Sequence, residues 1–117
     1  ANYVEAEKYY NIAIGIVEKD KNNRSKSEIL RGRANTYKYQ EKYDNAITDY
    51  LQALAIDEKN NDSYGQALNK LELASIYLAS GEYGKAIQYY KETLYFNPAI
   101  ALVGLGNSYL FLDNTPK

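Results

Sequence analysis

The sequence of 117 residues predicts an all-α protein built as a solenoid of antiparallel helix hairpins. Three observations favour this fold class. The chain contains an internal repeat with an offset of 40 residues. Within each copy, small and aromatic side chains lie three or four positions apart, a spacing that places them on one face of a helix. No segment shows the alternation expected of a strand, so the repeated unit is helical.

The repeat is clearest in the three stretches that begin at Tyr3, Tyr43 and Tyr83. In each stretch alanine follows after three residues, a second tyrosine after four more, and a small residue after three more. The alanine allows a neighbouring helix to approach closely, and the tyrosine fills the space beside it. A shorter pattern, in which a small residue precedes tyrosine by three positions, alternates with these stretches at residues 34–37, 74–77 and 106–109.

We therefore expect six helices separated by polar breaks. They are predicted at residues 3–18, 26–39, 43–56, 64–79, 83–96 and 99–112, with polar loops at 19–25 and 57–62 and short turns at 40–42 and 80–82. Ser63 is expected to cap the fourth helix. Asn97 and Pro98 are expected to begin the sixth, because proline is favoured in the first turn of a helix.

This pattern closely resembles the tetratricopeptide repeat. One repeat spans residues 27–60 and the next spans 67–98, with half repeats at 1–26 and 99–117 completing a single domain. Signature positions are occupied by Ala34, Tyr37, Tyr43, Ala46, Tyr50 and Ala53, and then by Ala74, Tyr77, Gly81, Tyr83, Ala86, Tyr90 and Pro98. Leu30, Lys70, Glu58 and Thr93 depart from the family pattern. The resemblance implies a right-handed superhelix that binds a partner protein's peptide or helix in its concave groove, without catalysis.

The resemblance also implies which residues line that groove. They come from the first helix of each repeat: Arg31, Asn35 and Lys38, then Leu71, Ser75 and Leu78, then Asn107. Arginine and lysine can pair with a carboxylate, and asparagine can hydrogen-bond a peptide backbone. Arg31 and Asn35 match two positions of the clamp that some family members use for chaperone C-termini. Glu72, Ile100 and Gly104 replace the rest of the clamp, so chaperone-tail binding is not expected.

These groove residues also have simpler interpretations. Arg31 and Lys38 could form a solvated helix face, paired with Glu28 and Glu41, which would contribute little. The leucines could pack against flanking helices, as an apolar stripe at helical spacing usually does. Asn107 could cap local structure. The signature tyrosines are expected in the core, while some of those off the signature should be exposed: Tyr9, Tyr39, Tyr64, Tyr89 and Tyr95.

The composition argues against several classes of function. Cysteine and histidine are absent, which removes the thiol nucleophile and the commonest general base and metal ligand. We therefore expect no catalysis, no cofactor and no metal; residues 57–62 lack the central glycine and final glutamate of a calcium loop. A net charge of −1 does not favour nucleic acid, and no run of 18 apolar residues spans a membrane. The compartment stays open, with the cytoplasm favoured.

The last predicted helix, residues 99–112, is apolar on almost every side. A helix that is apolar on all sides is normally buried against other helices. We predict that the chain self-associates through this end. Two alternatives to groove binding follow: a structural role in self-assembly, or a scaffolding part of a larger multidomain protein.

Overall fold

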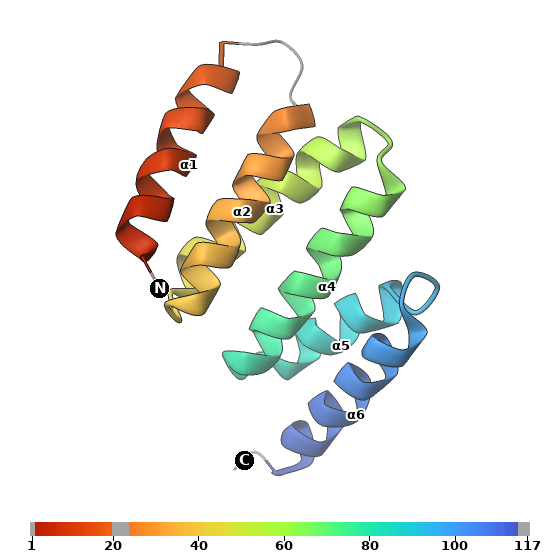
Figure 1. Ribbon diagram of the computed structural model, residues 1–117. Coiled ribbons are helices and arrows are strands. Elements are labelled where there is room, and N and C mark those ends of the chain that lie inside the picture. The colour runs from red at the N-terminus through yellow and green to blue at the C-terminus, as the bar shows by residue number, and fades with distance from the viewer. Residues whose placement is uncertain (1, 20–23, 115–117) are drawn as a thin grey trace. The chain divides into compact units, whose positions relative to one another are not determined.

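The computed structural model describes residues 2–19 and 24–114, and this part of the chain contains six α-helices and no strand (Figure 1). The helices are α1 (Tyr3–Val17), α2 (Arg24–Tyr39), α3 (Tyr43–Lys59), α4 (Ser63–Ala79), α5 (Tyr83–Glu92) and α6 (Pro98–Asn114). The predicted all-α class is confirmed. Two compact units, Ala1–Asn69 and Lys70–Lys117, divide the chain inside α4. The predicted assignment of half repeats and full repeats to a single domain stays a prediction.

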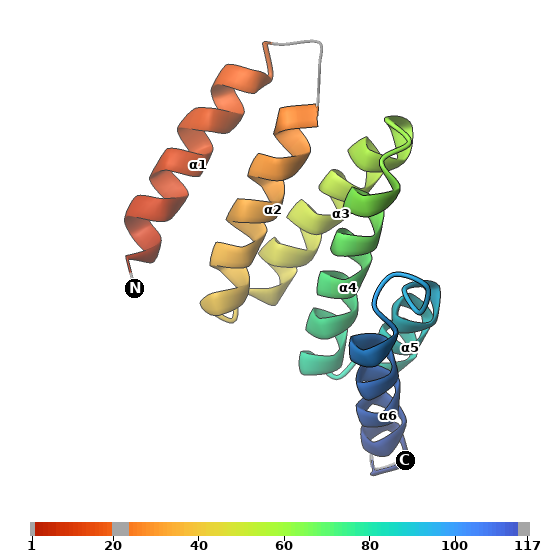
Figure 2. The same cartoon turned by 45° about the vertical axis from the view of Figure 1, so that its right-hand side comes forward.

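Consecutive helices pack as antiparallel neighbours within each unit. In the first unit α2 contacts both α1 and α3, and in the second unit α5 contacts α6. Figures 1 and 2 show these pairs running in opposite directions from both viewpoints. Short connections impose this arrangement, because a few residues can only return the chain alongside the helix it has just left.

Three turns of one design join α2 through α5. Each turn has one residue in the left-handed region, namely Glu41 (φ 59°), Asn61 (φ 56°) and Gly81 (φ 86°). The residue after it donates its amide hydrogen to the carbonyl five positions back: Lys42 to Tyr37, Asp62 to Asp57, and Glu82 to Tyr77. This is the Schellman C-cap, which satisfies the last carbonyls of a helix. Because the left-handed residues are 20 positions apart, two helix-and-turn units make the 40-residue repeat.

The breaks around α2, α3 and α4 differ from the prediction. Arg24 and Ser25 are helical rather than part of a loop, while residues 20–23 of that loop lie outside the described residues. Residues 57–59 belong to α3 rather than to a polar linker, because Asp57 is buried and finds polar partners inside the fold. The prediction that Ser63 caps α4 is also wrong. Asp62 does so, accepting a hydrogen bond from the Gly65 amide at 3.0 Å.

The end of α5 also differs, since the helix stops at Glu92 and not near residue 96. The Thr93 hydroxyl donates to the carbonyls of Tyr89 and Tyr90, and residues 93–96 form turns. Pro98 restricts the residue before it and cannot donate to a preceding turn, so α5 cannot continue into α6. The predicted start of α6 is confirmed: Asn97 caps it by accepting from the Ile100 amide, and Pro98 is its first residue.

The buried residues follow the repeat. All the alanines at signature positions in α2 to α5 are fully buried, and Tyr50, Tyr77 and Tyr90 are buried with them. Tyr37 and Tyr83 are only half-buried. Tyr9, Tyr39, Tyr64 and Tyr95 are exposed, as expected for tyrosines outside the signature. Burial thus separates the tyrosines that fill the hairpins from those that face solvent.

Candidate functional site

The predicted donors Arg31, Asn35 and Lys38 all lie on α2, and each of them already makes a contact inside the fold. The Nη1 atom of Arg31 lies 2.7 Å from Oδ2 of Asp57 on α3. The Asn35 Oδ1 accepts a hydrogen bond from the Tyr50 hydroxyl. The Lys38 Nζ lies 5.3 Å from the centre of the Tyr39 ring. The expected pairing of Arg31 with Glu28 is therefore wrong, because a buried carboxylate on the next helix takes its place.

Asp57 joins α2, α3 and α4 within the first unit. Its side chain is 1% exposed, and its Oδ2 accepts from Arg31 and, at 2.8 Å, from the Nδ2 atom of Asn69. Gly65 makes room for it, since a Cβ at that position would lie 2.4 Å from Oδ2. A buried carboxylate needs such partners to offset its lost hydration. This cluster was not predicted from the sequence, because nothing local marks Asp57 as buried.

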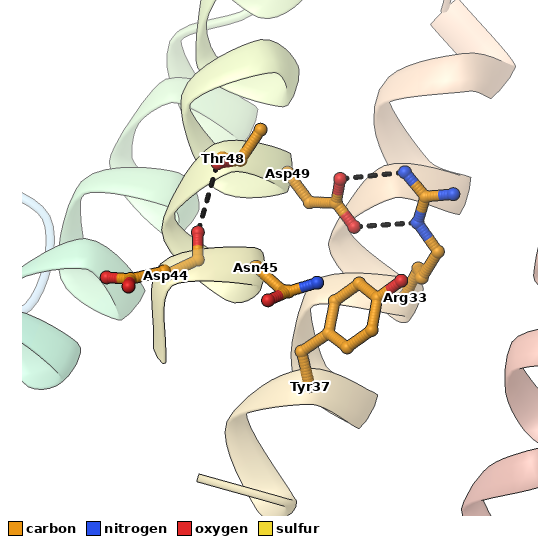
Figure 3. Close-up of a pocket in the computed structure, with 6 residues that line it drawn as sticks. All are labelled: Arg33, Tyr37, Asp44, Asn45, Thr48 and Asp49. Carbon is orange, nitrogen blue, oxygen red and sulfur yellow. Dashed lines mark hydrogen bonds and ion pairs between the residues drawn. The ribbon is translucent and has the colours of Figure 1, made fainter. Parts of the chain in front are cut away.

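A second buried ion pair, also unforeseen, joins α2 to α3 (Figure 3). The Nε and Nη2 atoms of Arg33 donate to the two carboxylate oxygens of Asp49 at 2.7 and 2.8 Å. Arg33 Nη1 also donates to Asn11 of α1 at 2.8 Å. The hydrogen bond to Asp49 raises the pKa of Arg33 above its ordinary value. This bidentate arrangement fixes the angle between guanidinium and carboxylate planes.

The ion pair forms one wall of a polar pocket of about 310 Å³. Tyr37 on α2 and Asn45 on α3 complete the side that faces Arg33, whereas the Asp44 carboxylate points away from it (Figure 3). The Thr48 hydroxyl donates to the Asp44 carbonyl. The strongest donor and the strongest acceptor of this pocket therefore satisfy each other.

The second unit contains an apolar depression, which we call the α4–α6 trough, with a volume of about 330 Å³. It is lined by Leu78, Tyr90, Ala99, Ile100, Val103, Gly104 and Asn107. Two predicted groove residues, Leu78 and Asn107, thus come together here. Asn107 is exposed, and it supplies the only amide among these apolar side chains.

A neighbouring pocket of about 420 Å³ also uses Leu78. Ser75, Ala79, Tyr83 and Phe111 line the rest of it, and the rings of Tyr83 and Phe111 lie 6.0 Å apart. The remaining predicted residue, Leu71, is half-buried on α4 and lines neither pocket. The structure therefore places Ser75 and Leu78 in this second pocket, and Leu78 and Asn107 in the trough.

Two glycines explain how closely the helices approach. A Cβ on Gly32 would lie 2.5 Å from the Tyr10 ring, and a Cβ on Gly104 would lie 2.3 Å from the Tyr90 ring. Tyr10 and Tyr90 occupy the same repeat position, 80 residues apart. Each lays its ring against the backbone of the next helix in its own unit. In the trough this contact makes Tyr90 part of the floor.

Within the described part of the chain, no group of three or more acidic, histidine or cysteine side chains could hold a metal ion. Across the same residues, no helix has both the length and the apolar character required to cross a bilayer.

The fold and its trough define a helical-repeat scaffold with an apolar depression on its surface. The tetratricopeptide repeat family matches residues 25–95, and the chain belongs to this family. This confirms the resemblance noted from the sequence, and such repeats form helical solenoids that generally serve as modules for protein–protein interaction. No curated protein matches the chain.

Proposed function

We propose that this chain binds a partner protein by holding a peptide segment with apolar side chains in the α4–α6 trough. The observation that carries this proposal is the exposure of the trough's aliphatic side chains: Ile100 is 54% exposed and Val103 is 64% exposed. Apolar surface exposed in a concave site gains free energy when a complementary apolar segment covers it. Asn107 supplies one amide that can hydrogen-bond the backbone of that segment.

The other predicted groove residues extend the proposal. Leu71 and Ser75 lie on α4 with Leu78, two helical turns and one helical turn away from it respectively. Arg31, Asn35 and Lys38 lie on α2 in the first unit and are proposed as a contact of their own. We expect the contribution of Arg31 to be small, because its guanidinium already bonds Asp57 and a ligand would have to share or displace that contact.

A library of random peptides displayed on phage tests the proposal, because selection from it does not require the partner's identity. We expect selection against the chain to enrich peptides with two or more aliphatic or aromatic residues. Their affinity is then measured by fluorescence polarisation. Val103→Glu should weaken binding at least about tenfold, since it places a carboxylate where apolar side chains are buried.

Leu102→Glu provides the matched control. Leu102 is the adjacent residue, is similarly exposed at 59%, and does not line the trough. Binding should therefore survive this change. Equal loss of affinity in both variants would contradict the trough assignment, as would enrichment of only acidic peptides that Arg31→Ala abolishes.

A further inference from the structure

In this fold an internal repeat helix packs against its hairpin partner and against a helix of the neighbouring hairpin. Among the described residues, α1 and α6 each make only the second of these contacts. Tyr10 of α1 lies against Gly32 of α2, as Tyr90 of α5 lies against Gly104 of α6. Helix α1 thus behaves as the second helix of a hairpin toward the helix that follows it. Helix α6 behaves as a first helix toward the one that precedes it. What each lacks among the described residues is its hairpin partner.

The sequences of these two helices match the two halves of the hairpin formed by α4 and α5. Helix α1 repeats the α5 pattern of tyrosine, alanine and two adjacent tyrosines, with Tyr3, Ala6, Tyr9 and Tyr10 in place of Tyr83, Ala86, Tyr89 and Tyr90. Helix α6 repeats the α4 pattern, with Leu105, Gly106 and Tyr109 in place of Leu73, Ala74 and Tyr77. One end of the chain therefore resembles α5 and the other resembles α4.

The matching faces differ in exposure. Ala74 and Ala86 are fully buried in the α4–α5 hairpin, and Tyr77 is 6% exposed. In contrast, Tyr109 is 45% exposed and Tyr9 is 65% exposed. A Cβ at Gly106, the counterpart of Ala74, would meet nothing within 4 Å. Tyr9, Gly106 and Tyr109 are thus exposed where their counterparts close the internal hairpin, while Ala6 and Leu105 are half-buried.

We propose that α6 of one copy packs against α1 of a second copy and re-forms between chains the hairpin that α4 and α5 form within one chain. The register follows from the internal hairpin. The stacked rings of Tyr77 and Tyr89, 5.9 Å apart and nearly parallel, are replaced by Tyr109 of one copy and Tyr9 of the other.

A second pair of positions supports this occupant. Lys70 and Glu92 form an ion pair at 3.8 Å across the α4–α5 hairpin. Their counterparts at the ends are Leu102 and Ile12, which are 59% and 52% exposed. Both partners are therefore apolar in the interface between copies. Two complementary apolar side chains at matched positions are what an association between helices requires.

This contact is heterologous, because the two copies use different surfaces. After pairing, one copy of the dimer keeps a free α1 face and the other keeps a free α6 face, so association continues beyond the dimer. The interface is also separate from the trough, since Leu102 and Val103 lie on different faces of α6. Self-assembly and peptide binding can therefore succeed or fail independently.

Sedimentation velocity on capped variants tests the proposal. Ala6→Arg blocks the α1 face and Gly106→Arg blocks the α6 face, because the alanines at these positions in the internal hairpin have no exposed surface. We expect the unmodified chain to increase in mass with concentration and each variant alone to remain a monomer. An equimolar mixture of the two should form a species of twice the monomer mass and stop there. A milder variant, Leu102→Ser, should weaken association about tenfold through lost apolar burial.

Gly15→Arg and Gly84→Arg serve as controls, because both glycines are exposed and a Cβ at either position would meet nothing within 4 Å. Circular dichroism should show equal helicity in all variants. Continued association of Ala6→Arg alone, with Gly106→Arg monomeric, would mean that α6 pairs with α6 and would overturn the proposal. A chain that stays monomeric at every concentration would overturn it as well.

Discussion

The α2–α3 and α4–α5 hairpins place opposite chemistry at the same repeat positions. Arg33 and Asp49 form a bidentate ion pair across the first hairpin. Forty residues later these positions hold Leu73, which is fully buried, and Tyr89, which stacks on Tyr77. The same backbone arrangement therefore accepts either a buried charge pair or an apolar and aromatic pair.

We infer from this difference that the residue tolerated at each of these two positions depends on the residue at the other. A buried charge is tolerated when its partner is present, and an apolar residue is tolerated when its partner is apolar. A mixed pair would leave an ion in a site without compensation. The repeat signature thus constrains the small and aromatic residues that set the helix spacing, while the polarity of the pair between them can change if both members change together.

The largest expected effect comes from breaking the pair on one side. Arg33→Leu leaves the Asp49 carboxylate, whose side chain is 4% exposed, without its main partner. We expect the free energy of unfolding to fall by about 3 kcal/mol, as is typical when one member of a buried pair is removed. Urea unfolding followed by circular dichroism measures this change.

The double variant Arg33→Leu/Asp49→Tyr tests whether the two hairpins are interchangeable, because it installs the residues of the second hairpin in the first. The introduced ring can stack on Tyr37 as Tyr89 stacks on Tyr77. We expect it to recover most of the lost stability, so the two changes should be strongly non-additive. A double variant no more stable than Arg33→Leu would show that the hairpins are not interchangeable at this pair.

Lys85→Leu, at an exposed ion pair, should cost less than about 1 kcal/mol.

The sequence predicted what is periodic and missed what depends on distant partners. The number of helices, the turns at Glu41 and Gly81 and the cap at Asn97 follow from local patterns. Asp57 was expected in a linker because it lies in a run of polar residues. Its burial depends on Arg31, 26 positions earlier, and on Asn69, 12 positions later. No local signal carries that information.

At the candidate site too, the sequence predicted the local pattern and missed the contacts between helices. The resemblance to the family selected Leu78 and Asn107 on their helix faces, and the structure brings both residues to one trough. The sequence could not show that Arg31 and Asn35 are engaged inside the fold, since partners on another helix are invisible to periodicity. It also could not distinguish Gly104, where a Cβ would collide with the Tyr90 ring, from Gly106, where a Cβ would meet nothing within 4 Å.

Substitutions at these glycines should have the second largest effect on stability. Gly104→Ala would place a Cβ 2.3 Å from the Tyr90 ring, and Tyr90 is too deeply buried to move aside. We expect a net loss of about 1–2 kcal/mol, because overpacking outweighs the gain in helix propensity. Gly32→Ala should cost less, since Tyr10 is only half-buried and its ring can shift. Gly106→Ala should stabilise by up to about 1 kcal/mol. Thermal unfolding at low protein concentration ranks the three; a reversed order would contradict the packing argument.

Tyr90 contributes a pH dependence to stability that we expect to be small. Burial disfavours the charged phenolate and raises the pKa of Tyr90 above its ordinary value of 10.0, and the negative charge of Glu72 raises it further. As the pH rises, the unfolded chain therefore loses this proton before the folded chain does. The contribution of neutral Tyr90 to stability is complete below about pH 10 and is lost as the pH rises through the folded pKa.

Urea midpoints measured from about pH 8 to 11 for the unmodified chain and for Tyr90→Phe isolate this contribution, because the two chains differ only by this hydroxyl group. The difference between the two should be constant below about pH 10 and should then move in favour of Tyr90→Phe. Glu72→Gln should reduce the movement, since it removes the second cause of the shift. If the difference stayed flat to the end of the range, Tyr90 would ionise alike in both states, and its ring would not be buried against Gly104 in solution.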